Sequence, residues 1–239
     1  FGVKVILLGV KGEEKIGDEI SKSAKFPLIN SIGLTTISQV ACLLKRCSLL
    51  ISNDTGTIHL STAVGTKVLL ISLGAANFQE TSPYGKGHLI VYSNLPCFPC
   101  DFGKNCPHML CRDKITVAHV FEAVAFALGG KEEIKKDRKF WEEINLLQTD
   151  FDQEGMLDYV PVIPVQFNKR EFYLVLYRLF WEFEDKKNGL SKKNRVEIIK
   201  RIKEMLKRNC YDDFEGKTLS FQDDLDVFLK LKLNAEKGI

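Results

Sequence analysis

Long apolar runs are missing from this 239-residue sequence. A membrane-spanning helix needs about 18 consecutive apolar residues, and no stretch reaches that length, so no such helix is predicted. The sequence also lacks an initiator methionine and a signal peptide, since it starts at Phe1 inside a run that already resembles a strand. These absences predict a fragment, or a chain whose upstream part is missing. With 45% hydrophobic residues, it is long enough for one large or two small domains.

An excess of charge of one sign is missing as well. The net charge is only +3, and no basic stripe of the kind that binds nucleic acid stands out, so no nucleic-acid partner is expected. Residues 1–130 carry 12 Lys/Arg and 9 Asp/Glu, whereas residues 131–239 carry 22 of each. The charge density thus more than doubles near Gly129-Gly130. We therefore predict one domain at 1–130 and a second at 131–239.

Short apolar runs alternate with helical patterns in the first domain. The runs typical of buried strands are Val3–Leu8, Leu28–Ile32, Leu49–Ser52 and Val68–Leu73. The helical patterns cover Glu13–Ser23, Thr36–Arg46 and the segment from Thr57. This order predicts an α/β fold with a doubly wound parallel sheet. Ligands of such sheets bind at the carboxyl ends of the strands.

The stretch Leu49–Thr66 combines a strand, a polar corner and a helix. The corner reads Asp54-Thr55-Gly56-Thr57. The first turn of a helix leaves N–H groups unpaired at the positive end of the helix dipole, and glycine lets a ligand approach the backbone. The corner is therefore a candidate anion site.

The residues around this corner match the pattern of a known family. Ser52–Val68 (SNDTGTIHLSTAVGTKV) resembles the D-[ST]-G-x-x-H-x-x-x-A-x-G-x-P motif of the bacterial heptosyltransferases, glycosyltransferase family 9. Ile32–Leu44 resembles their G-x-x-S-L-x-E-L-A-x-L-L helix, and the cysteines in Cys97–Cys111 resemble the cluster of the heptosyltransferase II branch. Two departures are present: Lys67 stands where proline is usual, and Gly74–Asn77 replaces an aromatic-glycine-proline-threonine string.

The resemblance implies the C-terminal, Rossmann-like, donor-binding half of a GT-B glycosyltransferase. Such a domain holds a nucleotide-diphosphate sugar, ordinarily ADP-heptose, for inverting transfer to the lipopolysaccharide core. The family's catalytic base belongs to the N-terminal domain, so no catalytic residue is assigned here, and we expect this chain alone not to transfer sugar at a useful rate. The expected location is the cytoplasm, with at most peripheral contact with the inner membrane. A non-catalytic or degenerate nucleotide-sugar-binding domain is the alternative.

The resemblance also implies roles for the corner. Thr55 and Gly56 would offer N–H groups to the pyrophosphate, with Thr57 in the same turn. Asp54 would accept hydrogen bonds from sugar hydroxyls, or would instead cap the helix. His59 would donate to a phosphate oxygen or to the sugar, or would be structural.

Two more candidate binding residues lie outside the corner. Glu13 matches the acid that accepts from the ribose hydroxyls, and Glu14 is the near alternative; both acids could instead only favour a helix N-terminus. Thr35 lies in the loop that would border the adenine.

Four cysteines lie within 15 residues, at Cys97, Cys100, Cys106 and Cys111. Four thiolates at such spacing are able to close a tetrahedral zinc site, so structural zinc is a candidate cofactor. Free buried thiols and disulfides are the alternatives, and disulfides are disfavoured in a cytosolic protein.

The second domain is expected to be a mainly helical extension. Helical patterns cover Lys131–Asn145, Glu171–Asp185, Ser191–Lys207 and Phe221–Leu233, whereas Asp158–Gln166 is extended, with two prolines that bar a central strand.

Other enzyme classes share the Asp-Thr-Gly string. Aspartic proteases need a second such carboxylate within an all-β fold, and this chain has one copy among βα units. The aspartate of ion-pumping ATPases lies in Asp-Lys-Thr-Gly-Thr, which differs here by one lysine. Both classes are rejected.

Overall fold

The structure is a computed structural model, and it describes residues 2–100, 103, 105–129, 134, 137, 139–152, 155–163, 196, 197, 200, 201 and 204. Its strands are β1 Val5–Leu7, β2 Leu28–Asn30, β3 Leu50–Asn53, β4 Val68–Ser72, β5 Leu89–Ser93, β6 Ile144–Phe151 and β7 Leu157–Pro161. Its helices are α1 Glu14–Ser23, α2 Ile37–Leu44, α3 Gly56–Ala63, α4 Phe78–Thr81, α5 Leu110–Lys114 and α6 Val117–Gly129. The α/β class and the first four predicted strands are confirmed.

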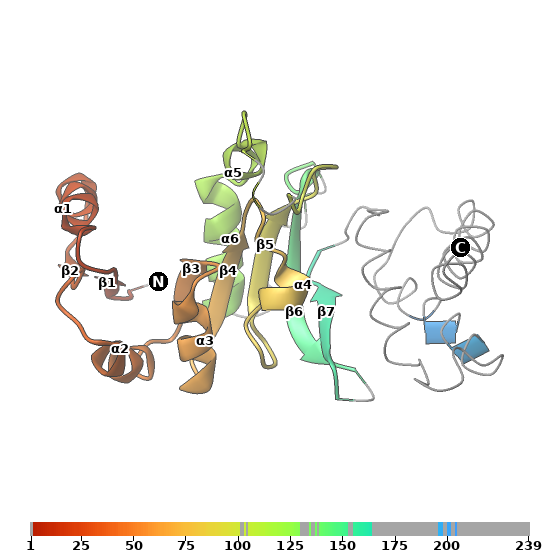
Figure 1. The fold of residues 1–239 in the computed structure, drawn as a ribbon, viewed down its shortest axis with the longest axis horizontal. Helices are drawn as coiled ribbons and strands as arrows, with labels where there is room; N and C mark the ends of the chain where they lie inside the picture. The colour runs from red at the N-terminus through yellow and green to blue at the C-terminus, as the bar shows by residue number, and fades with distance from the viewer. Residues whose placement is uncertain are drawn as a thin grey trace.

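The strands form two sheets instead of one (Figure 1). β1 and β2 pair in parallel as a small sheet, and the larger sheet has the order β3-β4-β5-β6-β7. β3, β4 and β5 are parallel, whereas β6 and β7 are antiparallel to their neighbours. The prediction of one doubly wound parallel sheet is thus wrong in two respects. Its first two strands are separate, and its far edge is antiparallel.

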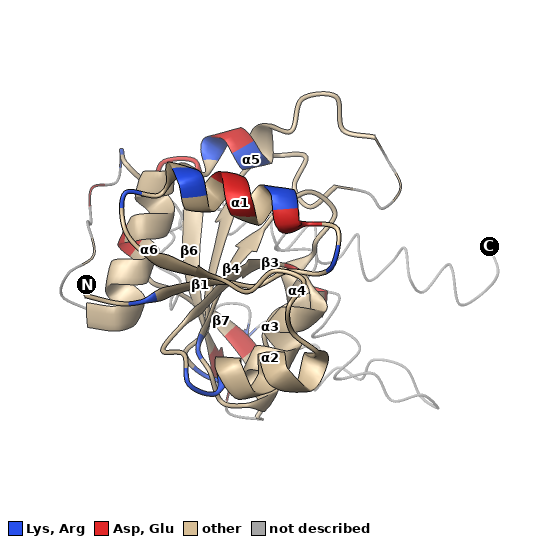
Figure 2. Cartoon of the chain, turned by 90° about the vertical axis from the view of Figure 1, so that its left-hand side faces the viewer, with Lys and Arg blue, Asp and Glu red and all other residues tan. Residues whose placement is uncertain are grey.

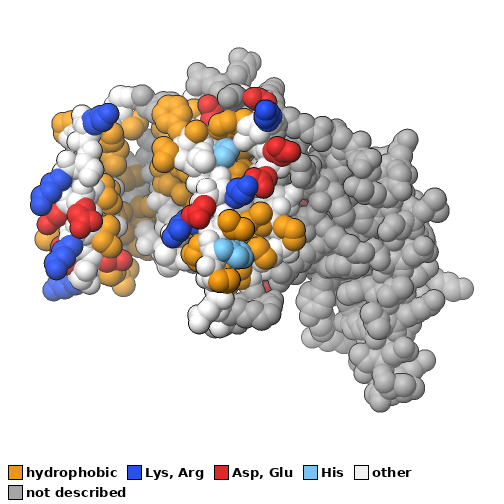
Figure 3. All heavy atoms as spheres, turned by 90° about the horizontal axis from the view of Figure 1, so that it is seen from above, with side chains coloured by type: hydrophobic (Ala, Val, Ile, Leu, Met, Phe, Trp, Pro, Cys, Tyr) orange, Lys and Arg blue, Asp and Glu red, His pale blue; other side chains and the backbone are white. Residues whose placement is uncertain are grey.

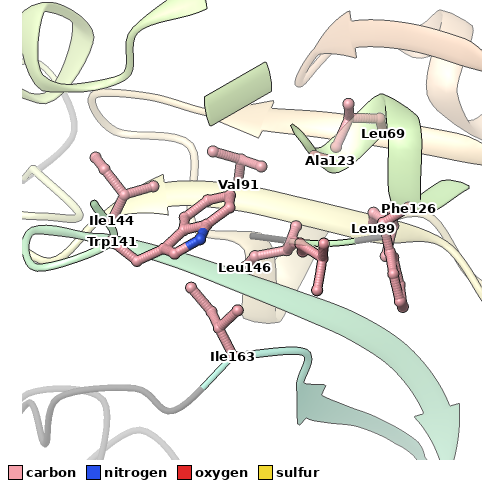
Figure 4. Packing of buried hydrophobic residues seen from close by; sticks show 10 residues of the cluster. Leu69, Leu89, Val91, Ala123, Phe126, Trp141, Ile144, Leu146 and Ile163 are labelled. Carbon is pink, nitrogen blue, oxygen red and sulfur yellow. The ribbon is translucent and has the colours of Figure 1, made fainter. Parts of the chain in front are cut away.

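The larger sheet forms the middle of three layers. One face packs on α3 and α4, through a cluster that includes Ile58, Phe78, Ile90 and Tyr92. The opposite face packs on α6 (Figure 4), and its cluster contains Leu69, Leu89, Val91, Ala123, Phe126, Ile134, Trp141, Ile144, Leu146 and Ile163. Because helices cover both faces, the central strands can be apolar throughout, as β4 (VLLIS) and β5 (LIVYS) nearly are.

The smaller sheet is linked to the larger one through α2. Thr36 begins this helix as the sequence predicts, with a capping box that it forms with Gln39. At the other end of α2, the carbonyl of Leu44 accepts a hydrogen bond from Thr66 Oγ1 at 2.6 Å, and Leu44 itself is buried. Helix α2 therefore connects the β1–β2 unit to the turn before β4.

The region after residue 130 differs from the predicted helices. Within the described residues, Lys139–Glu143 form turns and Ile144 begins β6, so the predicted helix at Lys131–Asn145 is wrong there. The larger sheet thus continues past the boundary predicted at residue 130. Of the extended segment predicted at Asp158–Gln166, the part up to Pro161 is confirmed as the edge strand β7, and residues 164–166 lie outside the described residues. The predicted helices at 171–185 and 221–233, and most of 191–207, lie outside the described residues.

Membrane-spanning helices were not expected, and none of the helices in the described part is both long and apolar enough to cross a bilayer.

Candidate functional site

The predicted strand–corner–helix is present at the carboxyl end of β3. Thr55 is the N-cap residue of α3, with an extended backbone (φ −144°, ψ 164°) and no side-chain cap. Ile58 donates its N–H to the carbonyl of Thr55 at 3.1 Å. Within the described part of the chain, the N–H groups of Gly56 and Thr57 donate to no other group. Two donors at the positive end of the helix dipole therefore point away from the protein's own acceptors.

Gly56 leaves open space in front of these donors. Its residue is exposed, and a methyl group built on its Cα would meet no atom within 4 Å. Its φ lies outside the left-handed region, so the backbone does not require glycine at this position. The lack of a side chain here is consequently better explained by access to the amides than by local geometry.

Asp54 does not cap the helix. Its carboxylate accepts a short hydrogen bond from the Thr81 hydroxyl of α4, 27 positions along the chain. The capping alternative is therefore wrong, because the N-cap position belongs to Thr55. Thr81 Oγ1 also lies 3.1 Å from the carbonyl of Asn77, at the start of α4. Thr81 was missed by sequence reasoning, since no motif links it to Asp54.

Helix α4 is held in place by the edge strand β7, from the same face of the larger sheet. The Tyr159 hydroxyl of β7 donates to the Phe78 carbonyl at 3.1 Å and lies 2.9 Å from Ser82 Oγ. The Phe78 ring is buried and meets the Tyr159 ring edge-on, with 5.2 Å between centroids. A continuous set of contacts therefore runs from β7 through α4 to the Asp54 carboxylate.

His59 lies in the first turn of α3 and is exposed. Its carbonyl accepts a hydrogen bond from Thr62 Oγ1 at 2.8 Å. No group in the described part of the chain hydrogen-bonds its imidazole, so the ring is not held as a buried structural histidine would be. An exposed imidazole beside unpaired N–H groups is compatible with a contact to an anion.

Glu13 and Glu14 hold the turn after β1. Glu13 Oε2 accepts from the Val10 N–H at 2.9 Å, and Glu14 Oε2 accepts from the Gly12 N–H at 2.7 Å. Both side chains therefore contact backbone amides in addition to lying at the start of α1. Within the described residues, no hydrogen bond or ion pair connects Glu13 with Asp54.

Thr35 has a hydroxyl that is buried without a hydrogen-bond partner among the described residues. Buried hydroxyls in folded proteins are normally hydrogen-bonded, so an unpaired one needs an explanation. It lies in the loop between β2 and α2, where the resemblance places the adenine.

The four cysteines do not gather around one point. Cys97 is exposed and Cys111 is buried, and no group of three or more His, Cys, Asp or Glu side chains in the described residues is placed to hold a metal ion. Cys106 Sγ instead accepts from the Met109 N–H at 3.3 Å. Backbone hydrogen bonds from His108 and then Met109 lower the pKa of this thiol. Structural zinc therefore stays an untested prediction.

Lys67, which stands where the resemblance expects proline, has a defined contact. Its Nζ donates to the carbonyl of Ala127 at 3.0 Å, in the last turn of α6. Cations near a helix C-terminus interact favourably with the dipole. The departure from the family pattern therefore serves the packing of α6 and does not touch the corner at Gly56.

Comparison with known proteins identifies relatives of the first half of the chain. Residues 1–110 match the family model described as glycosyltransferase family 9 (heptosyltransferase). Lipooligosaccharide heptosyltransferase 2 of Campylobacter jejuni serotype O:6 is 30% identical over 128 residues, which cover 51% of this chain and 40% of that protein. The protein of the same name from Haemophilus influenzae is 29% identical over 86 residues, covering 34% and 25%.

A crystal structure of a family 9 glycosyl transferase from Veillonella parvula also matches. It has 24% sequence identity and a TM-score of 0.33, and the match covers 35% of this chain and 24% of that one. The chain thus spans at most two fifths of the length of the relatives named here. Residues 1–110 are thus similar to glycosyltransferase family 9, and the corner sequence lies inside the matched region.

Proposed function

We propose that residues 1–110 are the donor-binding, C-terminal half of a GT-B glycosyltransferase. The donor would be ADP-heptose and the acceptor the lipopolysaccharide core. The names of the Campylobacter and Haemophilus relatives, lipooligosaccharide heptosyltransferase 2, support a heptosyl group as the transferred sugar. The observation that carries the proposal is the pair of unengaged N–H groups at Gly56 and Thr57, with open space before them. A helix N-terminus at the end of a parallel strand suits a diphosphate.

In the proposed reaction, an acceptor hydroxyl attacks the anomeric carbon of the sugar. A base from a domain outside this chain takes the hydroxyl proton, the bond from carbon to diphosphate oxygen breaks, and the configuration inverts. The diphosphate leaves toward α3, where the N–H groups of Gly56 and Thr57 stabilise the developing negative charge. The donors are fixed in the folded backbone, so they need no reorganisation during the reaction.

Asp54 and His59 would contact the sugar side of the same ligand. Thr81 holds one carboxylate oxygen of Asp54, and the other remains to accept from a sugar hydroxyl. Glu13 and Thr35 would contact the ribose and the adenine. These contacts would distinguish a nucleotide sugar from a free phosphate.

Lys and Arg side chains take no part in the proposed diphosphate site. Helices α2 (ISQVACLL) and α3 (GTIHLSTA) carry no Lys, Arg, Asp or Glu, whereas α1 and α5 carry both signs (Figure 2). Backbone donors and the helix dipole would therefore supply the positive potential. Binding that depends on such groups at close range is expected to depend less on salt than binding to a lysine cluster.

The complete enzyme would act in the cytoplasm, with peripheral contact with the inner membrane, where its acceptor is assembled. The remaining alternative is a degenerate domain that retains the fold without binding a nucleotide sugar.

Calorimetric titration of the 239-residue chain with ADP-heptose, ADP and UDP-glucose tests the proposal. We expect ADP-heptose to bind more tightly than UDP-glucose, and the Gly56→Val variant to lose the binding of both ADP ligands because its side chain fills the space before the amides. Ala63→Val, at the exposed far end of the same helix, is the matched control and should bind like the parent chain. A folded chain that binds none of the three nucleotides would favour the degenerate alternative.

A further inference from the structure

The segment after β5 contains a cysteine pair that the proposed function does not use. Cys97 and Cys100 are separated by Phe98 and Pro99, and both cysteines are thiols in the structure. The backbone turns where the Phe98 N–H donates to the Leu95 carbonyl at 2.9 Å, and it bends again at Pro99. A chain that turns and bends brings residues three positions apart toward each other, so this backbone favours closure of a Cys97–Cys100 disulfide.

Cys97 is accessible to a soluble reactant. Its residue is exposed, whereas Cys100 is partly buried. In Figure 3, the α5 end of the larger-sheet unit faces the viewer, and hydrophobic side chains, a class that includes cysteine, are exposed there beside charged ones. An exposed thiol with a second cysteine three positions later is the arrangement of thiol–disulfide exchange motifs. Disulfides of cytosolic proteins are usually transient and either catalytic or redox-sensing, so such a pair does not require an oxidising compartment.

Phe98, which lies between the two cysteines, packs into the core beside helix α4. Its side chain is only 2% exposed. The Phe98 ring stacks on the Tyr92 ring with 5.6 Å between centroids, and the Tyr92 ring lies 4.7 Å from the Phe78 ring of α4. Three aromatic rings therefore connect the cysteine pair with α4. Because closely packed side chains transmit strain, a shift of Phe98 would reach this helix.

A backbone hydrogen bond makes a second connection. Cys100 donates its N–H to the carbonyl of Gly74 at 2.8 Å, in the loop that leads from β4 to α4. Helix α4 begins at Phe78, shortly after this bond, and carries Thr81, which donates to Asp54. The cysteine pair thus contacts, through a side chain and through the backbone, the elements that hold the Asp54 carboxylate.

We propose that Cys97 and Cys100 form a reversible disulfide by exchange with a small-molecule disulfide, and that this modification loosens α4 and its contact with Asp54. The sulfur atoms of two thiols must approach to about 2.05 Å to bond, so the backbone at Phe98 must shift. That shift disturbs the aromatic contacts between Phe98 and α4. The consequence for donor binding rests on the proposed function, whereas the covalent step and the loosening of α4 do not.

Oxidised glutathione is a small-molecule disulfide of the required class. The exposed Cys97 thiolate attacks one glutathione sulfur, which forms a mixed disulfide and releases one glutathione thiolate. The Cys100 thiolate then attacks the Cys97 sulfur, which closes the Cys97–Cys100 bond and releases the second glutathione. Two electrons pass from the dithiol to the glutathione disulfide, and the two cysteine protons end on the two released glutathione thiols. An excess of reduced glutathione drives the same steps backwards.

Mass spectrometry of tryptic peptides tests the covalent step. The 239-residue chain is incubated with oxidised glutathione in EDTA, so that a bound metal ion does not mask the thiols, and remaining thiols are then blocked with iodoacetamide. Trypsin cleaves after Lys86 and Lys104, so Cys97 and Cys100 share one peptide that contains no other cysteine. We expect this peptide to lose two hydrogen atoms and to regain them in excess reduced glutathione. A mixed disulfide at Cys97 as the end product would overturn the proposal.

Serine variants distinguish the roles of the two cysteines. In Cys100→Ser, no second thiol displaces glutathione, so the mixed disulfide at Cys97 should accumulate. In Cys97→Ser, the remaining thiol is partly buried and should react with glutathione at least about tenfold more slowly. Cys42→Ser, which removes an exposed cysteine of α2, is the matched control and should form the Cys97–Cys100 disulfide like the parent. Equal reaction rates in the two single variants would overturn the assignment of Cys97 as the attacking thiol.

Backbone amide exchange, measured by NMR, tests the effect on α4. The Ser82 N–H donates to the Phe78 carbonyl at 3.0 Å, at the end of this helix. We expect the Ser82 amide to exchange at least about threefold faster after oxidation. The Thr149 amide, which donates to the His88 carbonyl beside the other end of β5, should keep its rate.

The double variant Cys97→Ser/Cys100→Ser controls for other effects of glutathione, and its Ser82 amide should exchange at the same rate before and after treatment. A Cys97–Cys100 disulfide that leaves the Ser82 exchange of the parent unchanged would overturn the coupling to α4. Neither measurement uses a nucleotide, so a failure here is distinct from a failure of the proposed function.

Discussion

The β1–β2 unit and the larger sheet are built from similar residues but are buried to different extents. β1 reads Val-Ile-Leu, and none of its residues is buried, whereas every residue of β5 (Leu-Ile-Val-Tyr-Ser) is. The difference lies in their neighbours. β5 has a paired strand on each side and helices on both faces, while β1 has one partner strand. An apolar run thus predicts a strand whose residues can be buried. Whether they are buried depends on the neighbouring strands and helices.

Replacing one isoleucine in each region should show this difference most strongly. Ile90→Ala removes a fully buried side chain of β5 and should lower the free energy of unfolding by about 2–5 kcal/mol, because it loses apolar burial and leaves a cavity. Ile6→Ala in β1 should lower it by less than about 1 kcal/mol. Urea denaturation followed by circular dichroism measures both. Equal losses would mean that β1 is as well packed as β5.

A Thr81 variant tests whether contacts with α4, which packs on the larger sheet, position the Asp54 carboxylate for binding. Thr81→Val keeps the shape of the side chain but removes the hydroxyl that donates to Asp54. We expect the affinity for ADP-heptose to fall by roughly 1–2 kcal/mol, with the affinity for ADP unchanged, because Asp54 would contact the sugar. Calorimetry gives both affinities.

Thr81→Ser is the matched control, since it keeps the hydroxyl and should bind like the parent. An unchanged affinity of Thr81→Val for ADP-heptose would show that the Thr81 contact does not position Asp54 for the sugar.

Acid should weaken the larger sheet through His88. His88 Nδ1 accepts from the Val68 N–H at 3.1 Å. Burial and then the positive charge of Lys67 lower the pKa of His88 below 6.5, although a hydrogen bond with the Tyr84 backbone raises it. Between the two pKa values, His88 is protonated in the unfolded chain but neutral in the folded chain. The contribution of His88 to the free energy of unfolding is therefore complete above pH 6.5 and declines as the pH falls toward the pKa of the folded state.

The slope for this one group cannot exceed about 1.4 kcal/mol per pH unit. Urea denaturation at pH 7.5 and pH 5.5 measures it. His88→Asn, which keeps a hydrogen-bond acceptor, should show a smaller loss between the two pH values. If His88→Asn lost as much stability between the two pH values as the parent, groups other than His88 would cause the loss.

Of the residues tested here, Lys67 should contribute least to the stability of the larger sheet. Lys67→Met removes the hydrogen bond to the Ala127 carbonyl but keeps an apolar stem, and should lower the free energy of unfolding by about 0.5–1 kcal/mol. Lys86→Met is the control, because the Lys86 side chain is 72% exposed in its ion pair with Asp150 and should change stability little. If both variants lost the same amount, the position of Lys67 at the end of α6 would not matter.

Sequence alone was enough for the order of elements up to β4. The apolar runs and the helical pattern of Thr36–Arg46 each have a local physical cause, so they are visible in the sequence. The break between β1 and β3 was not visible, because strand pairing depends on neighbours that the periodicity of one segment does not specify. Lys139–Glu143 were expected to be helical, but Trp141 and Ile144 instead bury their side chains against the larger sheet.

Some residues of the candidate site could likewise be predicted from the sequence, and others could not. The Asp54–Thr57 corner could be predicted because strand, turn and helix are consecutive in sequence. Thr81 and Tyr159 could not, since they approach Asp54 and α4 only through tertiary packing. Whether Glu13, Thr35 and His59 bind the nucleotide sugar remains a prediction for the titrations described above.

Tyr159 lies outside the part of the chain that matches the family model. The match to the family model ends at residue 110, yet the Tyr159 hydroxyl contacts helix α4, whose Thr81 donates to Asp54. A polypeptide trimmed at the limit of family resemblance would keep every residue of the motif and lose the tyrosine that supports it. The family-model match and the set of contacts that support the Asp54 corner thus have different boundaries, and the contacts extend at least 49 residues further along the chain (from 110 to 159).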